Sequence, residues 1–201
     1  MTTTPRTLLL TLTAALLCTP LALAQHETFT LNPDASQVAF TLPSNHDTTT
    51  GTFHVQKGTV DFDRATPAMT GLIIVASNTG TSGNASRDKK MLNDVLQAAK
   101  FSDITFAPQN YSGTIHPTGD SDLQVTGVFT LHGAPHTLTV PMHLHLDGNT
   151  LTAKTTFKVP YVQWGLKDPS WFVLKVAKEV DITLTLTGTL TPPITATHPV
   201  S

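Results

Sequence analysis

Two pairs of histidines have the residue type and spacing that could bind a transition metal. His143 and His145 stand two residues apart, and side chains at that spacing share one face of a strand. His132 and His136 flank a Gly-Ala-Pro turn and could lie near them. The same alternation turns Leu144 inward and both histidines outward, and no third ligand follows from the spacing. We therefore expect solvated histidines and no metal site, with a metal-dependent enzyme as a hypothesis to test.

A second set of residues resembles parts of hydrolase sites. The residues at 86–89 match the S-x-x-K pattern of acyl-serine enzymes, but the companion S-D-N and K-T-G elements are missing. Ser86 is also placed to cap a helix. Asp61 and Asp63 share the outward face of a predicted strand, where carboxylates increase solubility. Because the common nucleophile, metalloprotease and nucleotide-binding motifs are missing as well, the sequence indicates a protein without catalytic residues.

The third candidate is a polar group at the start of a predicted helix. Arg87 and Asp88 follow a loop of small residues at 79–84. A guanidinium beside the free N–H groups of a helix start suits an anionic or polar head group. The alternative is a structural contact of Arg87 with Asp88 or with the loop. Our head-group candidates are Arg87, Asp88 and Lys89, and Lys90 could meet the same group.

Composition indicates the elements that must position these residues. The chain has 201 residues, 39% hydrophobic and 13% charged, with 37 threonines and only two glutamates. Threonine favours strands, whereas helical bundles draw on Glu, Lys and Ala, so the composition predicts an all-β protein. The hydrophobic content excludes a disordered chain. The net charge of −2, with basic residues scattered singly, gives no patch for nucleic acid.

Both ends of the chain are predicted to lie outside the folded domain. Residues 1–24 combine a single charge, an apolar run and an Ala-Leu-Ala cleavage pattern, which together predict a signal peptide cleaved before Gln25. The apolar run is shorter than the ~20 residues of a membrane-spanning helix, so we expect no transmembrane segment after cleavage. The protein would be periplasmic or secreted. After cleavage it would contain no cysteine, since Cys18 is the only cysteine of the chain. The Pro-rich residues 192–201 should form a flexible tail, leaving one domain over 25–191.

Within that domain, alternation with a period of two predicts about eight strands. The segment 86–100 instead has apolar residues at helical spacing and predicts one inserted amphipathic helix. The strand at 69–77 is apolar on both faces, so another element should cover its outer side. Either that strand or an open barrel end could receive the apolar stripe of the helix. The strands are expected at 36–42, 51–63 with a break at Lys57-Gly58, 69–77, 104–111, 122–131, 137–146, 151–159 and 181–190.

An eight-stranded antiparallel sheet avoids exposed edges by closing into a barrel, whose interior is filled by side chains or holds one small ligand. The inward positions are almost wholly apolar, while the threonines face outward. About six of the nine phenylalanines point inward, so they could also fill the barrel and leave no cavity. The residues expected to line an apolar ligand site are Phe40, Phe53, Phe62, Ile73, Val75, Met91, Leu92, Val95, Phe106, Val125, Phe129, Leu144, Phe157 and Trp164.

The order of several short motifs over roughly residues 31–190 resembles the YceI-like family of exported proteins. The motifs are a G-x-F segment, GNASRD, LHGAP, VPYVQWGL and a closing EVDITL strand; their order is more specific than any one of them. The resemblance implies a lipocalin-like antiparallel barrel with a helix, and an interior that binds polyisoprenoid chains such as polyprenyl phosphates or quinones. By position, Arg87 and Asp88 match the family's Arg-Asp motif, and Gly127, Gly133 and Gly165 match its glycines.

The resemblance and the apolar inward faces lead to one functional expectation. The protein would be an exported, non-catalytic carrier of a long apolar chain, with no cofactor other than a possible bound polyisoprenoid or quinone. The alternative is an exported interaction or stress-related module with a filled barrel and no lipid. Residues 167–180 are longer and more apolar than the usual closing hairpin of the family. A homodimer is a further expectation, because edge strands and the strand at 69–77 offer pairing surfaces.

Overall fold

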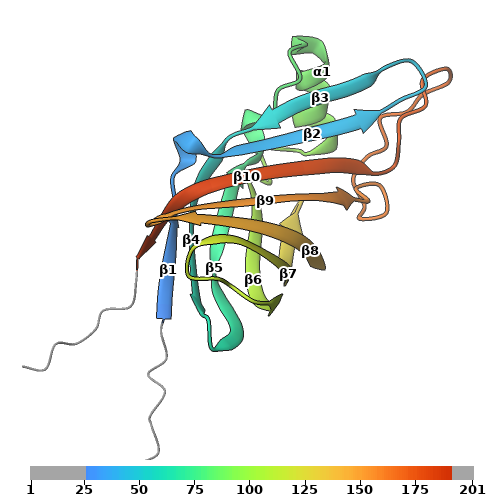
Figure 1. The fold of residues 1–201 in the computed structure, drawn as a ribbon. Coiled ribbons are helices and arrows are strands. Elements are labelled where there is room, and N and C mark those ends of the chain that lie inside the picture. Colours follow the sequence, from blue (N-terminus) through green and yellow to red (C-terminus); the bar gives the residue numbers. More distant parts are fainter. Residues whose placement is uncertain (1–25, 192–201) are drawn as a thin grey trace, which may run out of the picture.

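Ten strands form one antiparallel sheet in the computed structural model, which describes residues 26–191 (Figure 1). The predicted signal peptide and the Pro-rich tail lie outside these residues. Eight strands close into a ring in the order β1-β4-β5-β6-β7-β8-β9-β10, and β1 pairs with β10 to complete it. The predicted all-β, eight-stranded, lipocalin-like barrel is therefore confirmed. The strands are β1 His26–Leu31, β2 Gln37–Pro43, β3 Thr48–Phe53, β4 Val55–Asp63, β5 Thr66–Ala76, β6 Asp103–Gly113, β7 Gly119–Leu131, β8 Ala134–Asp147, β9 Thr150–Val159 and β10 Val180–Thr191.

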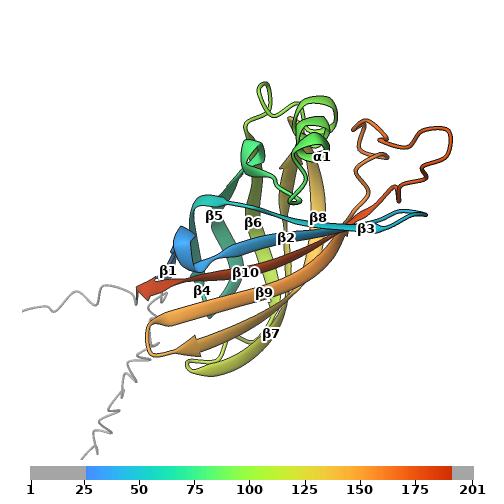
Figure 2. The ribbon, with the colours of Figure 1, turned by 90° about the horizontal axis from the view of Figure 1, so that it is seen from above.

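The hairpin β2–β3 lies outside the ring and extends one end of the barrel (Figures 1 and 2). The first half of β10 pairs with β2, from Asp181 to Thr185, and its last residues pair with β1. Gly188 lies where the partner changes, and a Cβ there would come within 2.2 Å of the Thr30 carbonyl oxygen. A glycine at this position therefore lets β1 approach closely enough to close the ring.

The eight strands of the ring differ from the eight that the sequence predicts. The segment 51–63 breaks at His54 into β3 and β4, and a bulge interrupts β4 between Val55 and Lys57. The closing strand β1 was not predicted, and it takes the place in the ring that the predicted strand at 36–42 would have had. Asp63 is 7% exposed and accepts a hydrogen bond from the Ala65 N–H at 2.8 Å, so its prediction as an outward, solubilising carboxylate is wrong.

The inserted helix is shorter than predicted. Helix α1 (Ala85–Lys90) continues as a single π-helical turn, η3 (Met91–Val95), and Gln97, with φ of 48°, stops it well before residue 100. The cap is Asn84, whose side chain accepts the Arg87 N–H at 3.1 Å, and not Ser86. Two short 3-10 turns, η1 (Pro33–Ala35) and η2 (Ser77–Thr79), complete the helical segments of residues 26–191.

The helix packs over the open end of the barrel, which is one of the two partners considered for its apolar stripe. Met91, Leu92 and Val95 pack against a core cluster that includes Leu131, Val159, Tyr161 and Leu166. The strand β5 does not receive the stripe. Leu72, on the outer face of β5, is 41% exposed, so the cover expected there is not found within the described part of the chain.

Candidate functional site

The barrel encloses a cavity of about 660 Å³. Every strand contributes to its wall because alternation turns one apolar face of each strand inward. Seven phenylalanines line this space without filling it: Phe29, Phe40, Phe53, Phe62, Phe106, Phe129 and Phe157. The volume lies within the ~300–1,000 Å³ range of pockets that bury most of a small ligand.

The residues predicted to line the site converge on this cavity, with two exceptions. Leu92 packs in the core cluster between the helix and the barrel and does not reach the cavity. Met91 and Val95, which are four residues apart and share one face of the helical segment, line the cavity instead. Trp164 stacks on His136, with ring centroids 3.9 Å apart and planes 5° apart. Phe29 lines the cavity but was not predicted, since it belongs to the strand β1.

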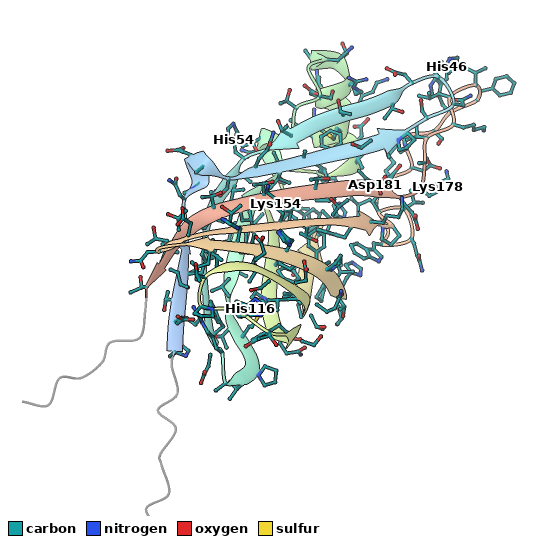
Figure 3. The ribbon with its side chains drawn as sticks, in the orientation of Figure 1. His46, His54, His116, Lys154, Lys178 and Asp181 are labelled. Atoms are coloured by element: carbon teal, nitrogen blue, oxygen red, sulfur yellow. The ribbon has the colours of Figure 1, made fainter. Side chains whose placement is uncertain are left out.

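One end of the cavity has a polar rim. Figure 3 labels one of its residues, His46, at the tip of the β2–β3 hairpin. The rest of the cavity is predominantly apolar, so the site can bury an apolar chain and leave a polar group at the rim. The polar residues of the rim come from the hairpin (Ser44, His46, Asp47, Thr49) and from the loop and helix opposite (Ser82, Asn84, Ser86, Arg87, Lys90).

Arg87 and Asp88 hold the loop at 79–84 in place. The Asp88 carboxylate accepts the Ser82 N–H at 2.8 Å and the Thr81 hydroxyl at 2.9 Å, and the hydroxyl of Ser82 also donates to it. The hydrogen bond from that hydroxyl is the main reason that the pKa of Asp88 lies below its usual value. Arg87 donates to the Ser82 hydroxyl at 2.7 Å and carbonyl at 3.1 Å, and to the Thr49 hydroxyl at 3.2 Å.

The structural contact considered for Arg87 is therefore present, although Arg87 also reaches the rim. Asp88 and Lys89 do not line the cavity, whereas Lys90 does. The loop meets the edge of β3 through two backbone hydrogen bonds between Thr52 and Thr81, of 2.9 and 3.0 Å. Gly51 permits this approach, because a Cβ there would lie 2.2 Å from the Thr81 carbonyl oxygen.

The loop between β9 and β10 forms the other wall of the mouth, which the sequence did not predict. Trp171, Leu174 and Val176 of this loop line the cavity. The hydroxyl of Tyr161 donates to the Ala177 carbonyl at 2.8 Å, and burial raises the pKa of Tyr161 to about 12. This phenol therefore stays neutral beside the apolar cavity. The available signal was the unusually apolar run at 171–174.

The two histidine pairs considered for a metal site, His132/His136 and His143/His145, are not arranged as one within residues 26–191. His143 and His145 are exposed, as predicted, and their Nδ1 atoms lie 2.8 and 2.6 Å from carboxylate oxygens of Asp122 and Asp120. His132 and His136 are not solvated as expected: His132 packs on Phe101, with ring centroids 4.1 Å apart, His136 stacks on Trp164, and the Nε2 atoms of both histidines are buried. Over residues 26–191, no group of three or more His, Cys, Asp or Glu side chains is arranged to hold a metal ion. The same residues include no helix that is long and apolar enough to cross a membrane.

Comparison with known proteins agrees with this architecture. A family model described as the YceI-like domain matches residues 29–188. A UPF0312 protein of Shewanella oneidensis is 29% identical over 159 residues, which are 73% of this chain and 81% of the relative.

Two solved structures share the fold. BcnA of Burkholderia cenocepacia superposes with a TM-score of 0.64 at 22% identity, covering 79% of this chain and 99% of that one. A polyisoprenoid binding domain from Saccharophagus degradans, implicated in plant cell wall breakdown, has a TM-score of 0.61 at 14% identity, covering 81% of this chain and 98% of that domain.

Proposed function

Because the chain belongs to the YceI-like family and encloses an apolar cavity behind a polar rim, we propose that it binds a polyisoprenoid or quinone-like lipid and catalyses no reaction on it. The apolar cavity carries this proposal. The likeness to a structure described as a polyisoprenoid binding domain supports the same class of ligand. The ligand chain would lie among the phenylalanines, with its polar end near Arg87 and Lys90.

The affinity would depend mainly on chain length. Burial of each CH₂ group is worth ~0.8 kcal/mol, so a chain of about 20 carbons gains ~16 kcal/mol before costs. Lost motion on binding costs ~4–15 kcal/mol, which leaves a net affinity between negligible and nanomolar. Shortening the chain by five carbons removes ~4 kcal/mol, about a thousandfold in Kd.

We further propose that the protein works after export, in the periplasm or outside the cell. The signal-peptide pattern of residues 1–24 supports this location. N-terminal sequencing of the protein recovered by osmotic shock would begin at Gln25. An uncleaved chain retained in the cytoplasm would contradict the proposal.

The direct test is to extract the purified protein with organic solvent and to identify lipids by mass spectrometry. Binding of geranylgeraniol and of the shorter farnesol should then be measured by calorimetry in wild type and in Ala153→Phe. Ala153 lines the cavity, so a phenyl ring there should weaken binding of the longer chain more.

Thr156→Phe, which adds the same ring at an exposed position of β9, is the matched control and should bind both alcohols like wild type. Both variants need wild-type-like unfolding curves for the comparison to count. A lipid-free wild-type protein that also ignores both alcohols would refute the proposed function.

A further inference from the structure

Three consecutive apolar side chains project into solvent from the β9–β10 loop. Trp171, Phe172 and Val173 are 65%, 92% and 54% exposed. Leu72, on the barrel wall, is the other exposed large apolar side chain of residues 26–191. Single exposed apolar residues are common, but three consecutive ones at the projecting part of a loop indicate a surface that binds an apolar partner. We call residues 171–173 the tip.

The loop that carries the tip is held against the β2–β3 hairpin by an isolated bridge between Ser44 and Val176, and it lies beside the tip of that hairpin in Figure 1. The Asn45 side chain donates to the Val173 carbonyl at 2.9 Å and accepts the Lys175 N–H at 2.8 Å. The Ala177 N–H donates to the Pro43 carbonyl at 2.9 Å. Within the loop, the Ser170 hydroxyl accepts the Val176 N–H at 2.9 Å. The exposure of the tip is therefore built into the fold.

The tip is continuous with the mouth of the cavity. Trp171 belongs to both, since it lines the cavity and is 65% exposed. Leu174 and Val176, directly after the tip, also line the mouth. An apolar ligand that leaves the cavity at this side thus passes directly from the apolar cavity wall to the apolar tip, without contacting polar side chains in between.

Charge around the tip favours an anionic partner. The loop contains three basic residues, Lys167, Lys175 and Lys178, and two acidic residues, Asp168 and Glu179. The Lys178 ammonium forms an ion pair with the Asp168 carboxylate, and Lys167 Nζ lies 3.8 Å from Asp94 Oδ2. Lys175, two residues after the tip, has no carboxylate within ion-pair distance in the described range.

Across the mouth, Lys90 and Arg87 add two positive charges, and the Asp47 carboxylate adds one negative charge. The residues at the mouth therefore carry more positive than negative charges. Because the whole chain has a net charge of −2, the rest of the folded domain is more acidic than the mouth. This distribution would turn the mouth, and not the rest of the barrel, toward a negative surface.

We propose that the tip inserts into a bilayer containing anionic phospholipid, so that the cavity mouth faces the membrane from which the lipid is taken. The inference rests on the proposed function, because docking serves the cavity only if its ligand is a membrane lipid. A projecting tip with Phe172 almost fully exposed suits the yielding interface of a bilayer, where Trp and Phe side chains are favoured. Lys175 would contact the phosphates of the head groups.

The experiment is co-flotation of the purified protein with vesicles of phosphatidylethanolamine and phosphatidylglycerol. Wild type should float, and a Phe172→Ser/Val173→Ser variant should lose about tenfold to a hundredfold in partitioning, the effect of withdrawing large apolar side chains from a membrane. Leu72→Ser, which removes the exposed apolar side chain of the barrel wall, is the matched control and should float like wild type. In a Trp164→Phe background, brominated lipids should quench the remaining Trp171.

Solution binding of geranylgeraniol separates this inference from the proposed function. The tip variant should bind the alcohol like wild type, because Phe172 and Val173 do not line the cavity. A wild type that binds geranylgeraniol but neither floats nor shows quenching would overturn bilayer docking and leave the lipid-binding proposal intact. Flotation that survives loss of the tip would also overturn it. So would a wild-type dimer that ignores vesicles and that the tip variant converts to monomer, since the tip would then be a contact between two copies.

Discussion

The charged residues at the start of α1 show how one side chain can have a structural contact and still face a ligand site. Asp88 accepts its hydrogen bonds from the loop residues 81 and 82, and Arg87 ties the same loop to Thr49 on β3. These bonds order the rim. The side chain of Lys90, one helical turn beyond Arg87, lines the cavity and makes no hydrogen bond or ion pair with the residues that the structure describes. Asp88 and Lys89 lie outside the cavity wall, so under the proposed function a head group at the rim would contact Lys90 rather than either of them.

Replacing Lys90 should therefore affect charged ligands selectively. In Lys90→Gln, the Kd for a prenyl phosphate should rise about two- to fivefold, the value of an exposed ion pair, while the Kd for the matching prenyl alcohol stays constant. Calorimetry with both ligands measures this difference. Lys89→Gln removes the same charge from the neighbouring position outside the cavity and should leave both constants unchanged. Equal losses in the two variants would mean that general charge, and not contact at the rim, attracts the phosphate.

Asp168 makes the loop below the tip sensitive to acid. Its carboxylate accepts hydrogen bonds from Lys178 and from the Ser170 N–H, and the Lys178 bond is the main reason that its pKa falls to about 2. A carboxyl with a lowered pKa stabilises the fold fully above its unfolded value of 3.8 and loses that contribution as the pH falls through about 2. The Ser170 amide signal in NMR should titrate near pH 2 and should not titrate in Asp168→Asn. A midpoint near 3.8 would show that the Lys178 contact does not persist in solution.

Among the strands, β1 shows where period-two reasoning failed. Its six residues, HETFTL, alternate correctly, but the strand is short and lies directly after the predicted cleavage site. Its partners, β4 and β10, are far away in sequence, so no local signal pairs them. The helix end was missed for a similar reason. Gln97 adopts a positive φ, which its residue type does not predict, whereas a glycine at this position would have indicated the end of the helix.

The attachment of β1 should depend on one buried ion pair. Arg64 donates two hydrogen bonds to the Glu27 carboxylate, of 2.6 and 2.9 Å, and Glu27 is only 7% exposed. Arg64→Gln leaves that carboxylate buried without its partner, so the free energy of unfolding in urea should fall by ~3–5 kcal/mol. The double variant Glu27→Gln/Arg64→Gln should recover most of the loss. Lys158→Gln, which breaks an exposed pair with Asp181, is the control and should change little. No recovery in the double variant would mean that Arg64 acts through packing alone.

For the molecule as a whole, the sequence predicted the barrel and most of the cavity wall because both follow from alternation. A strand with Phe, Leu or Val on one face and Thr on the other has one way to bury its apolar side, and β10 does so with Thr183 and Thr189 exposed outside and Leu186 buried inside. The mouth could not be predicted in this way. It is built from the β2–β3 hairpin, the loop at 79–84 and the β9–β10 loop, whose positions depend on single contacts such as those of Asn45 and Arg87. Alternation carries no information about loops.

A cavity that takes a ligand only in the folded state must couple occupancy to stability, and this coupling tests the whole molecule at once. At a free ligand concentration about a hundred times Kd, the folded state gains ~2.7 kcal/mol. For a domain of this size that gain should raise Tm by ~5–11 °C over the delipidated protein. Differential scanning calorimetry before and after extraction, and again after adding geranylgeraniol, measures the shift. Ala153→Phe should show a smaller shift, and Thr156→Phe the full one. If extraction and refilling leave Tm unchanged in wild type, the folded state does not bind the lipid in preference to the unfolded chain.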